Sequence, residues 1–323
     1  MPPGIDSKTM KPLYEEVQED WSSLAIGASK LEPEPPLALP VDVEDKFTRQ
    51  LVQVKWRPGD AIDLWIILPK DVKKPGAVLY LYGFDQDTDR FRNTQWDERV
   101  TAGGVAAVCF VSALSGQRFH DRPMEQWFVS ELQESIGSTV HDVKFILDYL
   151  AQRGDIDMDR IAMFGEGSGG AIAILSAAAD PRIKAVDTLE PWGDWPDFLA
   201  KASVVQDDAK HDDFVKPAFL KKVEPLDPVK YLPQLKIPLR VIQVHQVTTP
   251  PSESQDKIKD ALPKQAELLR FEDMMAMGSR LGNGRLFDWT KLKLQEAAKQ
   301  PGKLSADGKT GTQIGQNGKS EHP

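Results

Sequence analysis

The chain contains little cysteine and little histidine, and each shortage excludes a class of chemistry. Its 323 residues include a single cysteine, Cys109, which excludes an internal disulfide and any Cys-x-x-Cys metal or redox site. The five histidines are His120, His141, His211, His245 and His322. Any mechanism that needs a histidine base must use one of these five residues.

Excess positive charge and long apolar runs are also missing. The 40 basic residues are dispersed and are outnumbered by 49 acidic ones, which does not favour nucleic-acid or anionic-membrane partners. No run approaches the roughly 18 to 20 apolar residues of a membrane span. The start, Met1-Pro2-Pro3-Gly4, lacks the pattern of a signal peptide. We therefore predict a cytoplasmic location by default, with export after removal of a leader as the alternative.

Composition divides the chain into three parts. Residues 1–45 are predicted to form an N-terminal arm that includes an extended, Pro-rich connector, Glu32-Pro33-Glu34-Pro35-Pro36. Residues 46–300 carry the alternating pattern of a folded domain. Residues 301–323 are rich in Gly, Lys, Ser and Gln with almost no apolar side chains, so a disordered tail is expected there.

The central part alternates between strand and helix patterns. Residues 47–56 and 61–68 flank the turn sequence Arg57-Pro58-Gly59-Asp60, which predicts an antiparallel pair. Later apolar runs are typical of a parallel sheet that is covered on both faces, and they span residues 77–81, 105–111, 161–164, 183–186 and 239–244. Between them, Val140, Val143, Leu147 and Leu150 form a helical stripe, and residues 171–179 read as a buried helix. This order predicts an α/β fold with a doubly wound, mostly parallel sheet, in which ligands bind at the carboxyl ends of the strands.

A glycine-rich turn, Gly165-Glu166-Gly167-Ser168-Gly169-Gly170, joins one of these strands to the buried helix. Strand, tight turn and helix are the setting of a nucleophile elbow. Together with Gly83, Asp180-Pro181-Arg182 and Leu226-Asp227-Pro228, the motif resembles the α/β-hydrolase superfamily over residues 47–289, particularly its esterase and prolyl-oligopeptidase-like branches. The resemblance implies an α/β-hydrolase fold with a short lid insertion at residues 191–222.

The elbow of that superfamily reads G-x-S-x-G, but here the residue between Gly165 and Gly169 is Gly167. A register centred on Ser168 would put Glu166 where the turn needs a small residue. We therefore predict Gly167 at the centre, where the nucleophile is absent, and keep the Ser168 register as the alternative.

The resemblance also locates the other two members of a catalytic triad. The acid commonly follows the seventh strand, and Thr249 stands at that position. The histidine should follow the eighth strand, expected at residues 267–271, yet no histidine occurs between His245 and His322. His245 matches a structural histidine of the superfamily. The nucleophile, the acid and the histidine are thus all absent from their expected positions. Because triad members act as a unit, hydrolysis by a triad is not expected.

Backbone N–H donors remain in a site even where the catalytic side chains are absent. The resemblance implies an oxyanion hole formed by the N–H groups of Ser168 and Phe84, beside the N-terminus of the buried helix. The leading hypothesis is a pseudoenzyme that resembles esterases and binds a small carbonyl- or carboxylate-containing ligand or a protein partner, without metal or cofactor. One alternative is an active serine hydrolase of carboxylic esters or peptide bonds, with Ser168 as nucleophile and His120 as base. Another is a structural domain used for oligomerisation.

Three further features each allow two interpretations. Trp192 and Trp195 open the expected lid and either line a ligand pocket or pack the lid onto the sheet. Glu190 ends the sixth strand, where a role as helix cap or salt-bridge partner is favoured over a catalytic acid. The acidic loop Asp85-Gln86-Asp87-Thr88-Asp89 is followed by Arg90 instead of the glycine of a calcium loop, so a solvated loop is predicted.

Overall fold

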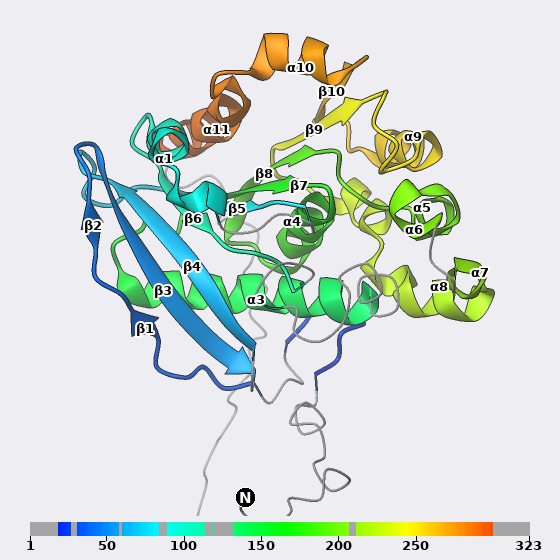
Figure 1. The fold of residues 1–323 in the computed structure, drawn as a ribbon, viewed down its shortest axis with the longest axis horizontal. Helices are drawn as coiled ribbons and strands as arrows, with labels where there is room; N and C mark the ends of the chain where they lie inside the picture. Colours follow the sequence, from blue (N-terminus) through cyan, green and yellow to red (C-terminus); the bar gives the residue numbers. More distant parts are fainter. Residues whose placement is uncertain are drawn as a thin grey trace, which may run out of the picture.

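A ten-stranded sheet organises the chain (Figure 1). The structure is a computed structural model that describes residues 19–26, 31–57, 60–83, 89–113, 118, 132–206 and 211–299. The strand order is β1-β3-β4-β6-β5-β7-β8-β9-β10, and β2 also pairs with β3. The strands are β1 Leu37–Ala38, β2 Asp42–Val43, β3 Phe47–Arg57, β4 Asp60–Pro69, β5 Ala77–Leu81, β6 Ala106–Cys109, β7 Ile161–Glu166, β8 Ile183–Leu189, β9 Leu239–Val244 and β10 Glu267–Phe271.

The pairing confirms the predicted sheet. β3 and β4 form an antiparallel pair, whereas β5 to β10 run parallel to one another. Two short strands in the predicted arm, β1 and β2, extend the sheet by pairing antiparallel with β3. Each has only two residues, too few for an alternating pattern to reveal. The predicted disordered tail lies outside the described residues.

Helices cover both faces of the sheet. They are α1 Thr94–Thr101, α3 Leu132–Arg153, α4 Ser168–Ala179, α5 Trp195–Lys201, α6 Ser203–Gln206, α7 His211–Phe214, α8 Pro217–Val223, α9 Ser252–Ala261, α10 Met274–Leu281 and α11 Asp288–Ala298. Short 3₁₀ turns are η2 Asp89–Arg92, η4 Glu224–Leu226, η5 Pro228–Lys230, η6 Leu232–Gln234 and η7 Arg285–Phe287. No helix within the described ranges combines the length and apolar character needed to cross a membrane.

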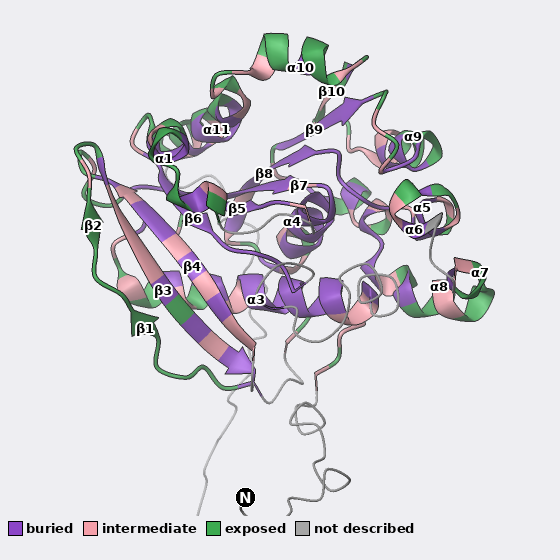
Figure 2. Cartoon of the chain, viewed as in Figure 1, coloured by how far each residue is buried: buried purple, intermediate pink, exposed green. Residues whose placement is uncertain are grey.

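Alternate residues of the central strands face the two helical layers. Leu79 and Leu81 of β5 belong to the core on the side of α3 and α4, whereas Val78 and Tyr80 belong to the core on the side of α1 and α11. The two helical layers cover the central strands, which are buried (Figure 2). A strand buried on both faces has to be apolar on both faces, which is why these strands read as continuous apolar runs.

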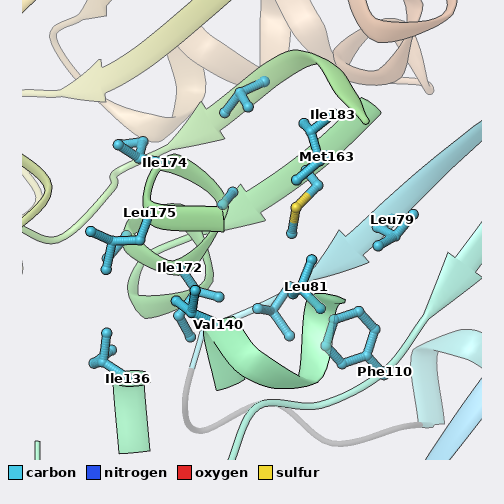
Figure 3. Packing of buried hydrophobic residues seen from close by; sticks show 14 of the residues in the cluster. Leu79, Leu81, Phe110, Ile136, Val140, Met163, Ile172, Ile174, Leu175 and Ile183 are labelled. Carbon is cyan, nitrogen blue, oxygen red and sulfur yellow. The ribbon is translucent and has the colours of Figure 1, made fainter. Parts of the chain in front are cut away.

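The predicted helical stripe faces this core. Val140, Val143, Leu147 and Leu150 of α3 are completely buried. Figure 3 shows how side chains of α3, α4 and the strands meet between the layers, among them Val140, Ile172 and Met163. The second predicted helix, α4, is buried around most of its circumference, and this fixes its N-terminus against the end of β7.

Candidate functional site

The turn between β7 and α4 has Gly167 at its apex. Its φ of 56° and ψ of −119° lie in a region that favours glycine, because a Cβ atom there clashes with the backbone. The N–H of Gly167 donates to the carbonyl of Leu189, and its own carbonyl accepts from the N–H of Trp192. The apex is therefore fixed to the end of β8 as well as to β7.

Gly165 and Gly169, two residues before and after the apex, lie in close backbone contacts. A Cβ atom on Gly165 would overlap the carbonyl oxygen of Gly169, and one on Gly169 would overlap the carbonyl oxygen of Leu81. Both positions therefore require glycine. Because these constraints surround Gly167 symmetrically, the backbone geometry favours the register centred on Gly167, in which the middle residue of the motif has no side chain.

Ser168 is the first residue of α4 and is completely buried. Its hydroxyl has no hydrogen-bond partner among the described residues, and its N–H belongs to the first turn of a helix, where no intrahelical acceptor exists. The N-terminus of a helix attracts carbonyl and anionic oxygens, because its free N–H groups and the helix dipole act in the same direction. Ser168 thus provides donors at the elbow, and within the part of the chain that the structure describes no base is bonded to its hydroxyl.

Trp192 closes the space next to the apex. A Cβ atom on Gly167 would lie 3.4 Å from Trp192 Nε1 and 3.7 Å from the Cα of Gly83, which are ordinary contact distances. Trp192 is 4% exposed, and its ring lies 4.9 Å from that of Phe198. Trp195 is 1% exposed and donates its indole N–H to Leu226. Burial of both rings favours the packing interpretation over a pocket mouth, since neither ring offers an open face to a ligand.

The predicted acid position, Thr249, follows β9. Its hydroxyl lies 2.7 Å from the hydroxyl of Ser203, at the start of α6. The neighbouring Thr248 hydroxyl is 3.4 Å from the same oxygen. Three hydroxyl groups, none of which carries a charge at neutral pH, therefore occupy the region where the resemblance implies a carboxylate.

Of the three histidines within the described ranges, two have side-chain partners away from the elbow. His141 bonds to Glu19 and to the carbonyl of Ser23, and His211 bonds to the carbonyl of Leu199. His245 is exposed just beyond β9. The base of the alternative mechanism, His120, and the second oxyanion donor, Phe84, lie outside the described residues, as does His322.

Glu190 has a different role from the one predicted. It forms neither a helix cap nor an ion pair with a described cation. Instead, its carboxyl group accepts the N–H of Val244 at the end of β9 and, at 3.1 Å, the side-chain amide of Gln255 in α9. The residue is 6% exposed, and burial raises the pKa of its carboxyl group to about 8, although the Val244 hydrogen bond lowers it. Glu190 thus links β8 to β9 and α9, largely as a neutral acid at pH 7.

Two further observations concern ligands. Among the described residues, no three His, Cys, Asp or Glu side chains are arranged to hold a metal ion. A cavity of about 780 Å³ lies at the opposite edge of the sheet, where Gly104 precedes β6. Lys46, Asp71, Glu98, Arg99 and Gly104 are among the residues that line it. None of the elbow residues contributes to this cavity.

Sequence reasoning missed a buried cluster of charges that joins the arm to α3. Arg57 of β3 bonds to Glu19 and, at 2.5 Å, to Asp142 of α3. Arg118 bonds to Asp60 and lies 2.8 Å from Asp142. No local pattern could have revealed this cluster, because its members come from four separate stretches of the chain, around residues 19, 57–60, 118 and 142.

Solved structures share this architecture. Acetyl xylan esterase 1 from Thermoanaerobacterium sp. JW/SL YS485 superposes with a TM-score of 0.61 and 14% identity, over 80% of this chain and 88% of that one. The acetyl xylan esterase from Paenibacillus sp. R4 superposes with a TM-score of 0.61 and 18% identity, over 74% of this chain and 83% of that one. The Pyrococcus horikoshii acylaminoacyl peptidase has a TM-score of 0.57 and 16% identity, over 78% of this chain and 41% of that one. No protein-family model and no curated protein matches the sequence. These similarities establish an α/β-hydrolase fold.

Proposed function

We propose that this chain is a non-catalytic protein with an esterase-like α/β-hydrolase fold, which binds a small carbonyl- or carboxylate-containing ligand at the N-terminus of α4. The observation that carries the proposal is Gly167. It occupies the apex of the elbow with a backbone conformation suited to glycine, so the turn is intact while the central side chain is missing.

Three features around the apex support the same conclusion. None of the described residues bonds to the hydroxyl of Ser168 and could take its proton, and a serine without a base is a weak nucleophile. Thr249 bonds to another hydroxyl instead of an imidazole. Glu190, a buried acid just beyond β8, bonds to Val244 and Gln255. What the turn retains is the helix N-terminus, and that is a binding element.

Absence of catalysis is tested with a fluorophosphonate probe and a panel of p-nitrophenyl esters. We expect no covalent labelling and no ester hydrolysis above the background rate. Ser168→Ala and Ser176→Ala form a matched pair, because both serines lie in α4, are completely buried and have unpartnered hydroxyls. Labelling that disappears in Ser168→Ala but persists in Ser176→Ala would establish the active serine hydrolase instead.

Binding is tested by following the amide resonance of Ser168 during titration with acetate, benzoate and ethyl acetate. We expect at least one of them to shift it. Ser168→Ala keeps the N–H donor, whereas Ser168→Pro removes it at the first position of a helix, where proline is tolerated. The ligand should still bind to Ser168→Ala and lose binding to Ser168→Pro. If none of the three compounds affects Ser168, the binding proposal is wrong.

A further inference from the structure

Residues 19–26 of the arm contact α3 through a buried histidine. The ring of His141 has Nδ1 at 2.6 Å from Glu19 Oε1 and Nε2 at 2.8 Å from the carbonyl oxygen of Ser23. Its side chain is 1% exposed. One turn earlier in α3, a Cβ atom on Gly137 would overlap the carbonyl oxygen of Trp21, so the segment lies directly on the helix.

Both partners of the His141 ring are hydrogen-bond acceptors. A neutral imidazole has one N–H donor and one acceptor nitrogen, whereas the imidazolium has two donors. Glu19 cannot supply the missing proton, because both of its oxygens also accept from Arg57 at 2.6 Å. Although burial raises the pKa of Glu19, hydrogen bonds from Arg57 and His141 lower it to about 2, so it is ionised at neutral pH. Only a protonated His141 satisfies both acceptors.

The charges around the ring give an independent argument. The groups of this cluster comprise three carboxylates and two guanidinium groups, namely Glu19, Asp60, Asp142, Arg57 and Arg118. All are buried except Asp60, whose side chain is 16% exposed. Asp20 is a further acidic group close to His141, and it is almost fully solvated. An imidazolium brings the buried cluster to three negative and three positive charges. A neutral ring would leave an uncompensated buried carboxylate, which is unfavourable in a medium of low dielectric constant.

We propose that the protonation state of His141 controls the attachment of residues 19–26 to α3. When the ring is charged, both the Glu19 carboxylate and the Ser23 carbonyl are bonded and the segment is held. When the ring loses its proton, one of these buried acceptors loses its donor. The equilibrium between attached and detached segment should then shift towards detachment by roughly 10- to 100-fold. Attachment takes up a proton, so it is strong at low pH and weakens as the pH rises.

The test is hydrogen exchange of the amides of residues 21–25 in the full chain between pH 5.5 and 8.5, corrected for the intrinsic pH dependence of exchange. We expect protection to fall by roughly 10- to 100-fold over this range in the wild type. In His141→Gln, which cannot be protonated, protection should be low and independent of pH. His211→Gln is the matched control, because the partners of His211 within the described residues are a carbonyl of α5 and the neighbouring Asp212, and neither belongs to residues 19–26.

A wild type with constant protection, or the same pH dependence in His141→Gln, would overturn the proposal. A loss of pH dependence in His211→Gln would do so as well. A second measurement does not depend on a variant that folds. In the wild-type protein at pH 6, the ¹⁵N resonances of His141 should show both ring nitrogens protonated, and a neutral tautomer in the attached state would overturn the proposal.

Discussion

The elbow around Gly167 and the charged cluster around Arg57 are both shielded from water, but they are built in opposite ways. At the elbow, the close contacts join backbone atoms of Gly165, Gly169 and Leu81, and the buried Ser168 hydroxyl has no hydrogen-bond partner among the described residues. In the cluster, the ion pairs join side chains, and Arg57 bonds to both Glu19 and Asp142. Arg57 and Arg118 also donate to the backbone carbonyls of Ser138 and Val111.

This difference explains how the turn can form with no side chain at its apex. Backbone contacts at the elbow depend on the absence of side-chain atoms, so the turn forms whether or not a nucleophile stands at its centre. The charged cluster depends on the presence of each member, because a buried charge without its partner is costly. The elbow should therefore be sensitive to added atoms, and the cluster to removed ones.

The largest effect should come from removing a member of the cluster. Asp142→Ala leaves Arg57 and Arg118 buried with one carboxylate fewer, and it removes the acceptor of the Trp56 indole. We expect the free energy of unfolding to fall by about 3–5 kcal/mol, as measured by urea denaturation at pH 7.

Asp148→Ala is the matched control for this change. Asp148 lies in the same helix and pairs with Arg182 at 2.6 Å, but its side chain is 51% exposed. An exposed pair contributes about 0–1 kcal/mol. Similar costs for the two variants would show that burial of the cluster adds nothing to stability, and the contrast with the elbow would be lost.

The same contrast decides what the sequence could predict. The elbow was predictable because its glycines lie within six residues of one another and its neighbouring strand and helix have clear apolar patterns. The sheet was predictable for the same reason. The cluster was not, since His141 lies 122 residues from Glu19 and Arg57 lies 85 residues from Asp142. Composition suggested only an extended arm, and nothing in it indicated which residues hold that arm.

Glu190 was misinterpreted for a related reason. Its position at the end of β8 was predicted correctly, but its partners lie 54 and 65 residues further along the chain, in β9 and α9. Its backbone has a φ of 49°, a conformation that a local pattern does not predict for glutamate. A side chain that bonds across the sheet acquires its role from the topology, which no single segment encodes.

Glu190 shares a feature with each region. It follows Leu189, which bonds to the elbow, and its buried carboxyl group makes side-chain hydrogen bonds, as the charged groups of the cluster do. Burial raises its pKa from 4.5 to about 8, so the folded state retains a proton that the unfolded state releases above pH 4.5. The free energy of unfolding should therefore fall as the pH rises from about 5 to 8, by at most about 1.4 kcal/mol per pH unit from this group. Below pH 4.5 the contribution is fully present.

Glu190→Gln should remove this slope, since glutamine does not titrate. The measurement is urea denaturation of both proteins at intervals between pH 5 and 8, with the difference between them as the readout. Other acids whose pKa burial raises contribute equally to both curves, namely Asp97, Asp187, Asp194 and Asp227. Parallel curves would mean that Glu190 has the same pKa in the folded and unfolded chain.

The smallest effect should come from adding one methyl group at the elbow. In a helix, Gly→Ala ordinarily stabilises by about 1 kcal/mol, and Gly278→Ala in α10 should do so, because no atom lies within 4 Å of the new Cβ position. Gly169→Ala in α4 should instead destabilise by about 1–3 kcal/mol, since its Cβ would overlap the carbonyl oxygen of Leu81 and move β5 or α4. Thermal unfolding of the two variants gives the comparison. If backbone contact holds the elbow, the two substitutions change the free energy of unfolding in opposite directions. Stabilisation by both substitutions would mean that α4 and β5 are not in contact at this turn.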